Sequence, residues 1–130
     1  MYAFDGKSLN PVWETREMRN QMASSVWIGD FLYGFDEGML KCLDANTGER
    51  VWMQRRLGKG ALSAADGKLI IQSEGGELVI AEATPENFKE LSRADVMPGA
   101  KRCWIMPVLS NGTIYCRGSK GELVAVDVSK

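Results

Sequence analysis

Short apolar runs separated by turn dipeptides recur along the chain. Gly29-Asp30, Asp66-Gly67 and Asn111-Gly112 each separate two runs that are rich in apolar, aromatic or β-branched residues. Glycine, aspartate and asparagine tolerate the positive φ angles of tight turns, so each dipeptide predicts a β-hairpin. A second glycine turn follows about eight residues later in each case, and a third run then ends in an acidic residue.

The third runs make the repeat easiest to see. They read LKCLD at residues 40–44, LVIAE at 78–82 and LVAVD at 123–127. Their spacing of about 38 and 45 residues, with several short strands in each unit, is typical of β-propeller blades. A blade is covered on both faces by its neighbours, which explains why residues 69–71 and 78–81 are continuously apolar.

The closing hairpin of a unit also occurs at the start of the chain. LKCLDANTGERVWMQR at residues 40–55 aligns without a gap on MYAFDGKSLNPVWETR at residues 1–16. The alignment places Asp5 on Asp44 and Trp13 on Trp52. We expect the acid to cap the turn, Gly48 to let the chain reverse, and the tryptophan to pack between adjacent blades. Because Asp127 and Glu82 stand at the same position of their units, we interpret these acids as turn caps rather than catalytic groups.

The sequence therefore predicts an all-β fold, a β-propeller segment of four-stranded antiparallel blades that forms a partial ring of about three blades. We assign the last two strands of one blade to residues 1–22, full blades to 23–60 and 61–98, and the first three strands of another to 99–130. Thr84-Pro85-Glu86 departs from the repeat and predicts a single helical turn before a strand over residues 88–93.

Just over three blades cannot close a ring of six to eight. We therefore expect that the chain is a fragment of a longer propeller or that it self-associates, because open sheet edges pair readily. The partners expected are the remaining blades of a longer chain, a second copy, or another protein.

Composition argues against several other kinds of partner. The formal net charge is −1, with acids and bases interspersed, so no basic face for nucleic acid is apparent. The longest basic cluster, Arg55 and Arg56 with Lys59 nearby, is interpreted as a solvated strand end. No apolar stretch approaches the roughly 20 residues that span a bilayer, and no secretion signal is visible.

Cysteine and histidine usage limits the chemistry that the chain can perform. Cys42, Cys103 and Cys116 form no CxxC pair and histidine is absent, which argues against a structural zinc site and a Cys-His or Ser-His-Asp arrangement. A two-residue turn at Asn111-Gly112 places Cys116 opposite Pro107, so we do not expect a bridge to Cys103. All three cysteines are interpreted as small buried apolar residues.

Three strings carry a family resemblance. LYGFD at residues 32–36, LDANTGERVW at 43–52 and GELVAVD at 121–127 resemble the blade motif of quinoprotein-like β-propellers, also called PQQ-like repeat proteins. The chain is similar to the C-terminal part of bacterial members whose activity is unassigned. One branch of the family contains dehydrogenases that bind pyrroloquinoline quinone (PQQ) and calcium at the centre of the ring. Another contains envelope proteins that use the same blades as cofactor-free interaction scaffolds.

The resemblance implies a non-catalytic binding scaffold without a cofactor, located in the periplasm or cell envelope. The alternative is a ring segment of a PQQ-dependent dehydrogenase, which would bring PQQ and calcium. The adjacent cysteine pair common in those dehydrogenases is missing here. Trp27 and Trp104, on strands expected to lie nearest the ring axis, are candidates to stack on a planar ligand. We favour inner-strand packing for both, and assign no catalytic or metal-binding residue.

Overall fold

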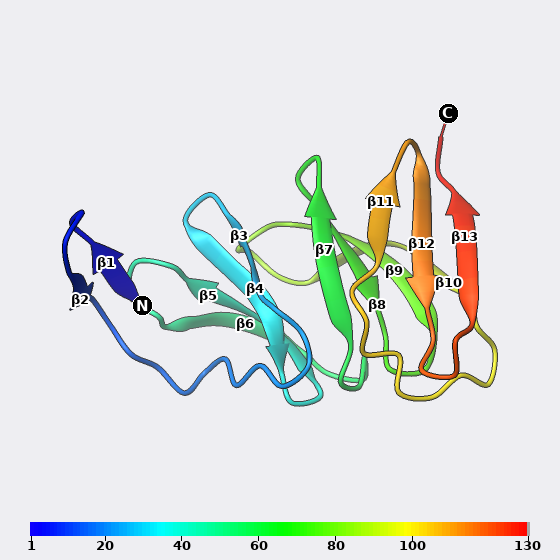
Figure 1. Cartoon of the computed structure of the whole chain (residues 1–130), viewed down its shortest axis with the longest axis horizontal. Helices are drawn as coiled ribbons and strands as arrows, with labels where there is room; N and C mark the ends of the chain where they lie inside the picture. Colours follow the sequence, from blue (N-terminus) through cyan, green and yellow to red (C-terminus); the bar gives the residue numbers. More distant parts are fainter. Residues whose placement is uncertain (130) are drawn as a thin grey trace.

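The protein consists of β-strands in four antiparallel sheets (Figure 1). The computed structural model describes residues 1–129, so Lys130, the last residue of the predicted fourth unit, lies outside the described residues. The strands are β1 (Tyr2–Phe4), β2 (Leu9–Pro11), β3 (Val26–Ile28), β4 (Phe31–Asp36), β5 (Met39–Asp44), β6 (Arg50–Gln54), β7 (Ala61–Ala65), β8 (Lys68–Gln72), β9 (Glu77–Glu82), β10 (Lys89–Asp95), β11 (Val108–Ser110), β12 (Thr113–Arg117) and β13 (Leu123–Asp127).

Each sheet is a simple meander in which consecutive strands pair. The sheets are β1-β2, β3-β4-β5-β6, β7-β8-β9-β10 and β11-β12-β13. The three predicted two-residue turns are confirmed, because Ile28 pairs with Phe31, Ala65 with Lys68, and Ser110 with Thr113. Asp66-Gly67 and Asn111-Gly112 have positive φ at both residues, as this turn type requires. The prediction of an all-β, partial propeller with four-stranded blades is thus confirmed.

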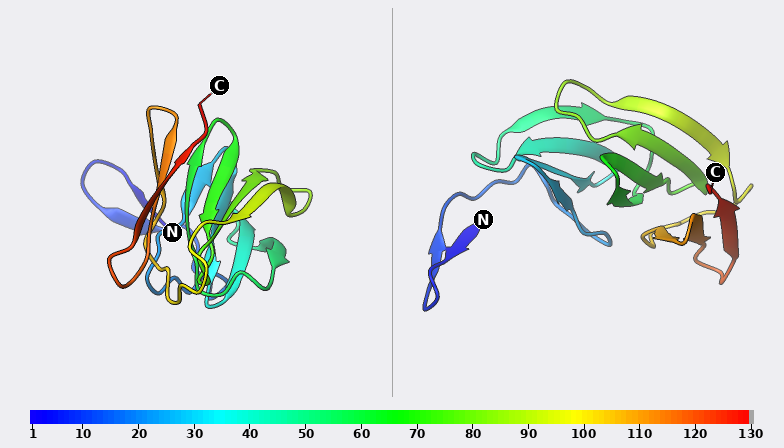
Figure 2. Two further views of the ribbon diagram at one scale, coloured as in Figure 1. Left: turned by 90° about the vertical axis from the view of Figure 1, so that its right-hand side faces the viewer. Right: turned by 90° about the horizontal axis from the view of Figure 1, so that it is seen from above.

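The sheets stand side by side along an arc (Figure 2). The first strands of the three larger sheets, β3, β7 and β11, lie toward its concave side, and the outer strands β6 and β10 lie along its convex side. The β1–β2 hairpin stands apart at one end. This arrangement follows from right-handed twist, since neighbouring twisted sheets that pack face to face rotate steadily around an axis.

Two apolar clusters lie between the larger sheets. The first joins β4 and β5 to β7, β8 and β9, and includes Tyr33, Leu40, Leu69 and Ile71. The second joins the third sheet to the last, and includes Ile70, Leu78, Ile114 and Cys116. Alternate residues of β8 therefore face opposite cores, which is why its apolar run is continuous.

The outer strands of the two complete sheets share a β-bulge. In the first, Cys42 pairs with Trp52 and Leu43 with Arg50, which leaves Val51 as the extra residue. In the second, Ile80 pairs with Ser92 and Ala81 with Glu90, which leaves Leu91 as the extra residue. The bulges are equivalent, so Ser92 occupies the position that Trp52 has in the preceding sheet.

Three local predictions are wrong. Pro85 and Glu86 form a bend rather than a helical turn. The preceding backbone is held by other contacts, because the Ala83 N–H donates to the Gly67 oxygen and the Thr84 oxygen accepts the Trp52 indole N–H. The following strand starts at Lys89 instead of residue 88. Trp104 is not on a first strand, since β11 begins at Val108 and Trp104 lies in the preceding connection.

Candidate binding face

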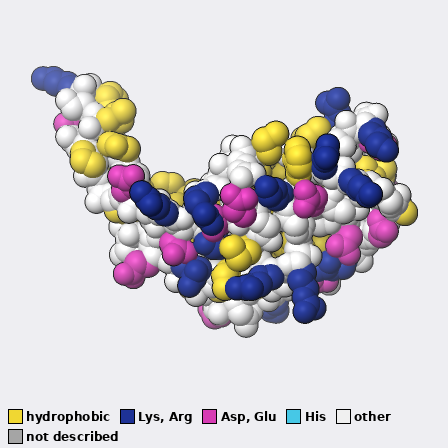
Figure 3. Space-filling model, turned by 90° about the horizontal axis from the view of Figure 1, so that it is seen from below, with side chains coloured by type: hydrophobic (Ala, Val, Ile, Leu, Met, Phe, Trp, Pro, Cys, Tyr) yellow, Lys and Arg dark blue, Asp and Glu magenta, His cyan; other side chains and the backbone are white. Residues whose placement is uncertain are grey.

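The loops at one end of the sheets form a continuous surface, which we call the connector face. It comprises the connections between sheets and the turns between the second and third strands of each larger sheet, residues 12–25, 37–38, 55–60, 73–76, 96–107 and 118–122. Figure 3 shows this end of the molecule, where basic and acidic side chains gather across the surface. Loops from four sheets therefore meet on one face.

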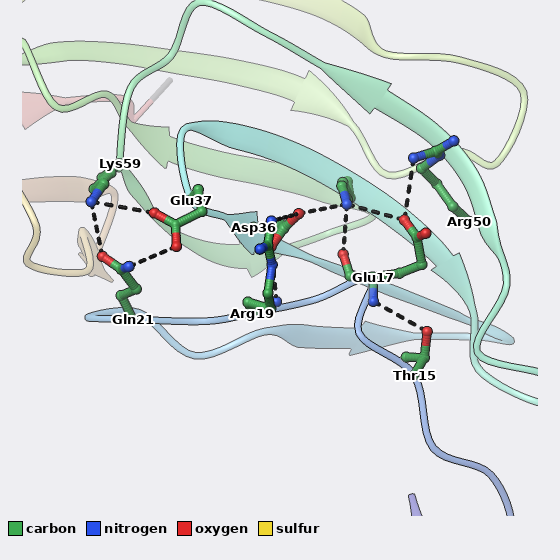
Figure 4. A network of polar contacts seen from close by, with 9 residues as sticks. Thr15, Glu17, Arg19, Gln21, Asp36, Glu37, Arg50 and Lys59 are labelled. Carbon is green, nitrogen blue, oxygen red and sulfur yellow. Dashed lines mark hydrogen bonds and ion pairs between the residues drawn. The ribbon is translucent and has the colours of Figure 1, made fainter.

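A buried ion pair supports this face (Figure 4). Asp36 and Lys41 flank the Glu37-Gly38 turn, and Lys41 Nζ lies 2.6 Å from Asp36 Oδ2. Their side chains are 1% and 5% exposed. Arg19 binds the same carboxylate through its backbone N–H and its guanidinium, with Nε 2.8 Å from Oδ1. Burying this pair is tolerated because every charged group in it has a partner.

The ion pair also holds the first connection in place. Lys41 Nζ donates to the backbone oxygen of Glu17 at 2.8 Å and lies 3.1 Å from its carboxylate, which Arg50 also contacts at 3.2 Å. Burial raises the pKa of Asp36, but hydrogen bonds from Arg19 and Lys41 outweigh it and lower the pKa to about 2. Hydrogen bonding and charge from Lys41 likewise lower the pKa of Glu17. Sequence reasoning missed this network, although a lysine in the otherwise apolar third strand LKCLD was a signal for it.

Glu74 ties together the next two connections. Its Oε2 accepts the backbone N–H of Lys59 at 3.1 Å, and its Oε1 accepts the indole N–H of Trp104 at 3.0 Å. Lys59 Nζ in turn lies 3.3 Å from the Glu37 carboxylate and donates a hydrogen bond to Gln21 Oε1 at 3.0 Å. The connector face is therefore cross-linked by polar contacts from the first connection to the third.

Basic side chains line two adjoining hollows on this face. One, of about 480 Å³, has Arg56, Lys101 and Arg102 in its lining together with the acids Glu74 and Glu77. The other, of about 490 Å³, shares Lys101 and Arg102 and adds Trp104 and Lys120. We call Arg56, Lys101, Arg102 and Lys120 the cationic row. Within residues 1–129 their side chains make no ion pair or hydrogen bond.

The acids near the cationic row already have partners. Besides Glu74, Glu77 pairs with Arg93 at 2.9 Å, and Glu122 accepts the backbone N–H of Lys120 at 2.9 Å. Arg56 and Arg102 have φ angles of 71° and 60°, a left-handed conformation that costs free energy for a residue with a side chain. Glu74 and Glu122 bind neutral N–H donors and keep their negative charge beside the row. The row is therefore a set of basic side chains without a direct ion pair within residues 1–129, on a strained but well-anchored backbone.

The two candidate stacking residues do not form a common site. Trp27 lies on β3 but is 58% exposed, with its indole N–H donated to Gly29, so the inner-strand packing predicted for it is wrong. The reason is that its side chain lies on the face of β3 opposite Val26 and Ile28, which pack against the first apolar cluster. Trp104 is half-buried and held by Glu74.

The repeated acids and tryptophans act within the sheets. Asp5 Oδ1 accepts the N–H groups of Lys7 and Ser8, and Asp44 Oδ1 those of Asn46 and Thr47. Asp127 accepts the N–H of Ser129. The hydrogen bonds expected of turn-capping acids are present at these three positions, and they lower the pKa values of Asp5 and Asp127. The same prediction is wrong for Glu82, whose carboxylate pairs with Lys89 at 2.8 Å instead of binding a turn N–H.

Each tryptophan of the closing hairpin reaches the next sheet. Trp13 Nε1 donates to the backbone oxygen of Ala45, and Trp52 Nε1 to that of Thr84, both at 2.9 Å. The Trp13 ring packs on Gly48, where an added Cβ would lie 2.6 Å from ring carbon Cε3. Gly48 has φ of 77°, so it provides both the turn and the space for the ring.

Within residues 1–129 no three cysteine, aspartate or glutamate side chains gather closely enough to hold a metal ion. The three cysteines are buried and unbridged, and burial raises the pKa of Cys42 and of Cys116 to about 11. No part of residues 1–129 forms a helix with the length and apolar character needed to cross a membrane.

The fold resembles several solved propellers. BamB from Moraxella catarrhalis matches with a TM-score of 0.66 and 18% identity over 80% of this chain. The quinohemoprotein alcohol dehydrogenases ADHIIG from Pseudomonas putida HK5 and from Comamonas testosteroni match with TM-scores of 0.65 and 0.63, identities of 14% and 18%, and coverage of 83% and 82%. The chain spans 32% of the BamB chain and 19% of each dehydrogenase chain.

Identities this low establish the fold alone. None of the curated proteins matches the chain. The model of the family described as outer membrane protein assembly factor BamB matches residues 36–130, most of the chain. That match agrees with the repeated strands, capped turns and tryptophan contacts, and the chain therefore belongs to this family of PQQ-like repeat β-propellers.

Proposed function

We propose that the chain is a non-catalytic propeller segment that serves as a protein-binding scaffold, with the connector face as its binding surface. The observation that carries the proposal is the cationic row of Arg56, Lys101, Arg102 and Lys120, which has no carboxylate partner within residues 1–129. The chain also belongs to a family whose description is outer membrane protein assembly factor BamB, and this supports the proposal of a binding scaffold. The partner expected is a protein that presents a segment rich in aspartate or glutamate.

The physical basis is charge complementarity on a fixed support. Arginine guanidinium groups bind carboxylates through two parallel hydrogen bonds, and lysines add point charges. Complementary charge speeds association and selects against partners of the wrong sign. The ion pair of Asp36 with Lys41 and the hydrogen bonds of Glu74 hold the surrounding loops in place. Less conformational entropy is therefore lost when a partner binds.

We propose a location in the cell envelope, by analogy with a family whose description names outer membrane protein assembly. The second candidate is a ring segment of a PQQ-dependent dehydrogenase. The observation that favours it is the likeness of fold to two quinohemoprotein alcohol dehydrogenases. Under that candidate, PQQ and calcium would be bound together with blades beyond those described.

Binding of a defined acidic probe tests the scaffold proposal. Fluorescein-labelled hexaglutamate is titrated with the full chain at low salt and followed by anisotropy, with hexaglutamine and hexalysine as comparison peptides. We expect hexaglutamate alone to bind, and Arg56→Gln/Arg102→Gln to weaken binding at least tenfold. The matched control, Lys7→Gln/Lys68→Gln, removes the same charge far from the connector face and should retain binding.

Loss of binding in both double variants, or no binding of hexaglutamate to the unmodified chain, would reject the cationic row as the surface. The dehydrogenase candidate is tested separately by adding PQQ with calcium and measuring quinone absorbance and alcohol-dependent dye reduction. Saturable quinone binding with dye reduction would favour that candidate over the scaffold.

A further inference from the structure

The contact between the third and fourth sheets lacks the aromatic side chains of the contact before it. Between the second and third sheets, Trp52 packs against Tyr33 and Phe88, with ring centroids 5.9 and 6.1 Å apart. In the third sheet the position of Tyr33 is taken by Ile70 and that of Trp52 by Ser92, as the strand registers show. Two rings of the repeated interface are thus replaced by much smaller side chains.

A pocket opens where these rings are missing. It has a volume of about 400 Å³ and lies between the third and fourth sheets, where Ile70, Ile80, Leu109, Ile114 and Val128 provide an apolar lining and Asp66 and Lys68 add charged groups. Ile70 and Ile80 pair with each other, and Ile80 pairs with Ser92, so the pocket lies on the face of the sheet toward which Ser92 points. Apolar concave sites of this size commonly hold small ligands or single side chains.

The pocket also has the counterpart of the backbone oxygen that accepts the Trp13 indole; Trp52 binds the oxygen one residue further along, that of Thr84. The Ala45 N–H donates to the backbone oxygen of Asp30, and the Val128 N–H donates to that of Gly112. Asp30 and Gly112 are each the second residue of a two-residue turn, so Val128 is the counterpart of Ala45. The oxygen of Ala45 accepts the Trp13 indole. The oxygen of Val128 accepts no hydrogen bond from residues 1–129, and Val128 lines the pocket.

From these observations we propose that the pocket between the third and fourth sheets binds the tryptophan side chain of a partner polypeptide. An indole fits because the chain itself places one at two equivalent positions, over apolar side chains and against a backbone oxygen. The Val128 oxygen would accept the indole N–H. This inference is independent of the cationic row, which lies on the connector face rather than at the hairpin-turn end of the sheets.

The test titrates the full chain with N-acetyl-tryptophanamide, a model of the side chain in a polypeptide, and follows the isoleucine methyl signals by NMR. We expect saturable shifts at Ile70, Ile80 and Ile114, with little change at Ile28, which packs against the other apolar cluster. The 1-methylindole analogue, which lacks the donor, should bind about fivefold more weakly. N-acetyl-leucinamide should bind more weakly still. Free indole, run in parallel, separates a small-molecule site from a peptide site: binding of indole without binding of the amide would reject the proposal.

Ser92→Trp supplies the missing ring from within the chain. We expect this variant to abolish binding of the probe, whereas Lys89→Trp, on the same strand at a position that pairs with Glu82, should leave it intact. Unchanged methyl signals in the unmodified chain, or equal binding by the Ser92→Trp variant, would overturn the proposal. The methyl signals decide the question even if Ser92→Trp does not fold.

Discussion

The indole N–H of Trp52 donates to the backbone oxygen of Thr84 in the next sheet, at 2.9 Å. The bond joins the outer strand of one sheet to the loop after the third strand of its neighbour, and the ring packs between Tyr33 and Phe88. A single side chain thus contributes apolar burial, aromatic contacts and a hydrogen bond to one interface.

Replacing Trp52 by alanine should lower the free energy of unfolding by about 3 kcal/mol, since it leaves a cavity and an unpaired backbone oxygen. Trp52→Phe, which loses the donor but keeps a ring, should lower it by about 1 kcal/mol. Urea unfolding followed by circular dichroism measures both. Trp27→Ala is the control, because Trp27 is 58% exposed, and its effect should stay within about 0.5 kcal/mol. Equal losses at the two positions would contradict the role given to Trp52.

Gly48→Ala should be more destabilising than Gly67→Ala. Both glycines have positive φ, 77° and 68°, so both substitutions introduce backbone strain. Only at Gly48 would the new Cβ also meet a ring, that of Trp13, whereas nothing lies within 4 Å at Gly67. We expect Gly67→Ala to lower the free energy of unfolding by about 1 kcal/mol, and Gly48→Ala to lower it by about 2 kcal/mol more, as measured by urea unfolding. When Trp13 is also replaced by alanine, the additional destabilisation caused by Gly48→Ala should disappear.

Asp36 should make the fold sensitive to acid. Its pKa is about 2, below the usual aspartate value, so its ionised form stabilises the folded state above the unfolded pKa. This stabilisation, about 2 kcal/mol, should be lost as the pH falls from about 4 through about 2. Asp36→Asn should remove that part of the pH dependence and also destabilise the protein at pH 7 by about 3 kcal/mol, because the buried Lys41 loses the charge of its nearest carboxylate. A stability profile unchanged between pH 4 and pH 2 in the unmodified chain would argue against the ion pair.

The chain on its own should self-associate. Large apolar side chains are exposed at both ends of the row of sheets, with Phe4 and Leu9 68% exposed at one end and Leu123 67% exposed at the other. Contiguous exposed apolar groups next to open strand edges favour association. Light scattering should give at least twice the chain mass of 14.4 kDa at high concentration. Phe4→Glu/Leu123→Glu should shift the population toward the monomer. A monomer at every concentration would refute this expectation.

The strands, the turns and the capping roles of Asp5, Asp44 and Asp127 were predictable because they depend on short-range patterns. A two-residue turn such as Asn111-Gly112 determines the register of its hairpin, and the shared motif of Asp44 and Trp52 marks a closing hairpin. The helical turn predicted at Thr84 failed because a distant indole, that of Trp52, binds its carbonyl oxygen. Local preference was overridden by a contact between sheets.

The candidate site was predictable only in part, since its residues are far apart in the chain. Arg56 was recognised as part of a basic cluster, but its neighbours Lys101 and Arg102 come from the next connection between sheets, beyond the whole β7–β10 sheet. Arg19 reaches Asp36 across a segment without regular strand structure, so no periodicity marks the pair. The exposure of Trp27 likewise depends on which face of β3 its neighbours cover.

Leu69 and Ile70 are adjacent in β8 yet belong to different apolar clusters. The folding energy of the row is consequently a sum of nearest-neighbour couplings, as in a one-dimensional array, and the β7–β10 sheet takes part in both of the couplings that rest on an apolar cluster. Opening a terminal sheet breaks one coupling, whereas opening the β7–β10 sheet breaks both. Amide protection should therefore be greatest in β8 and β9 and fall toward the β1–β2 hairpin and β13, so that the chain melts from its ends inward.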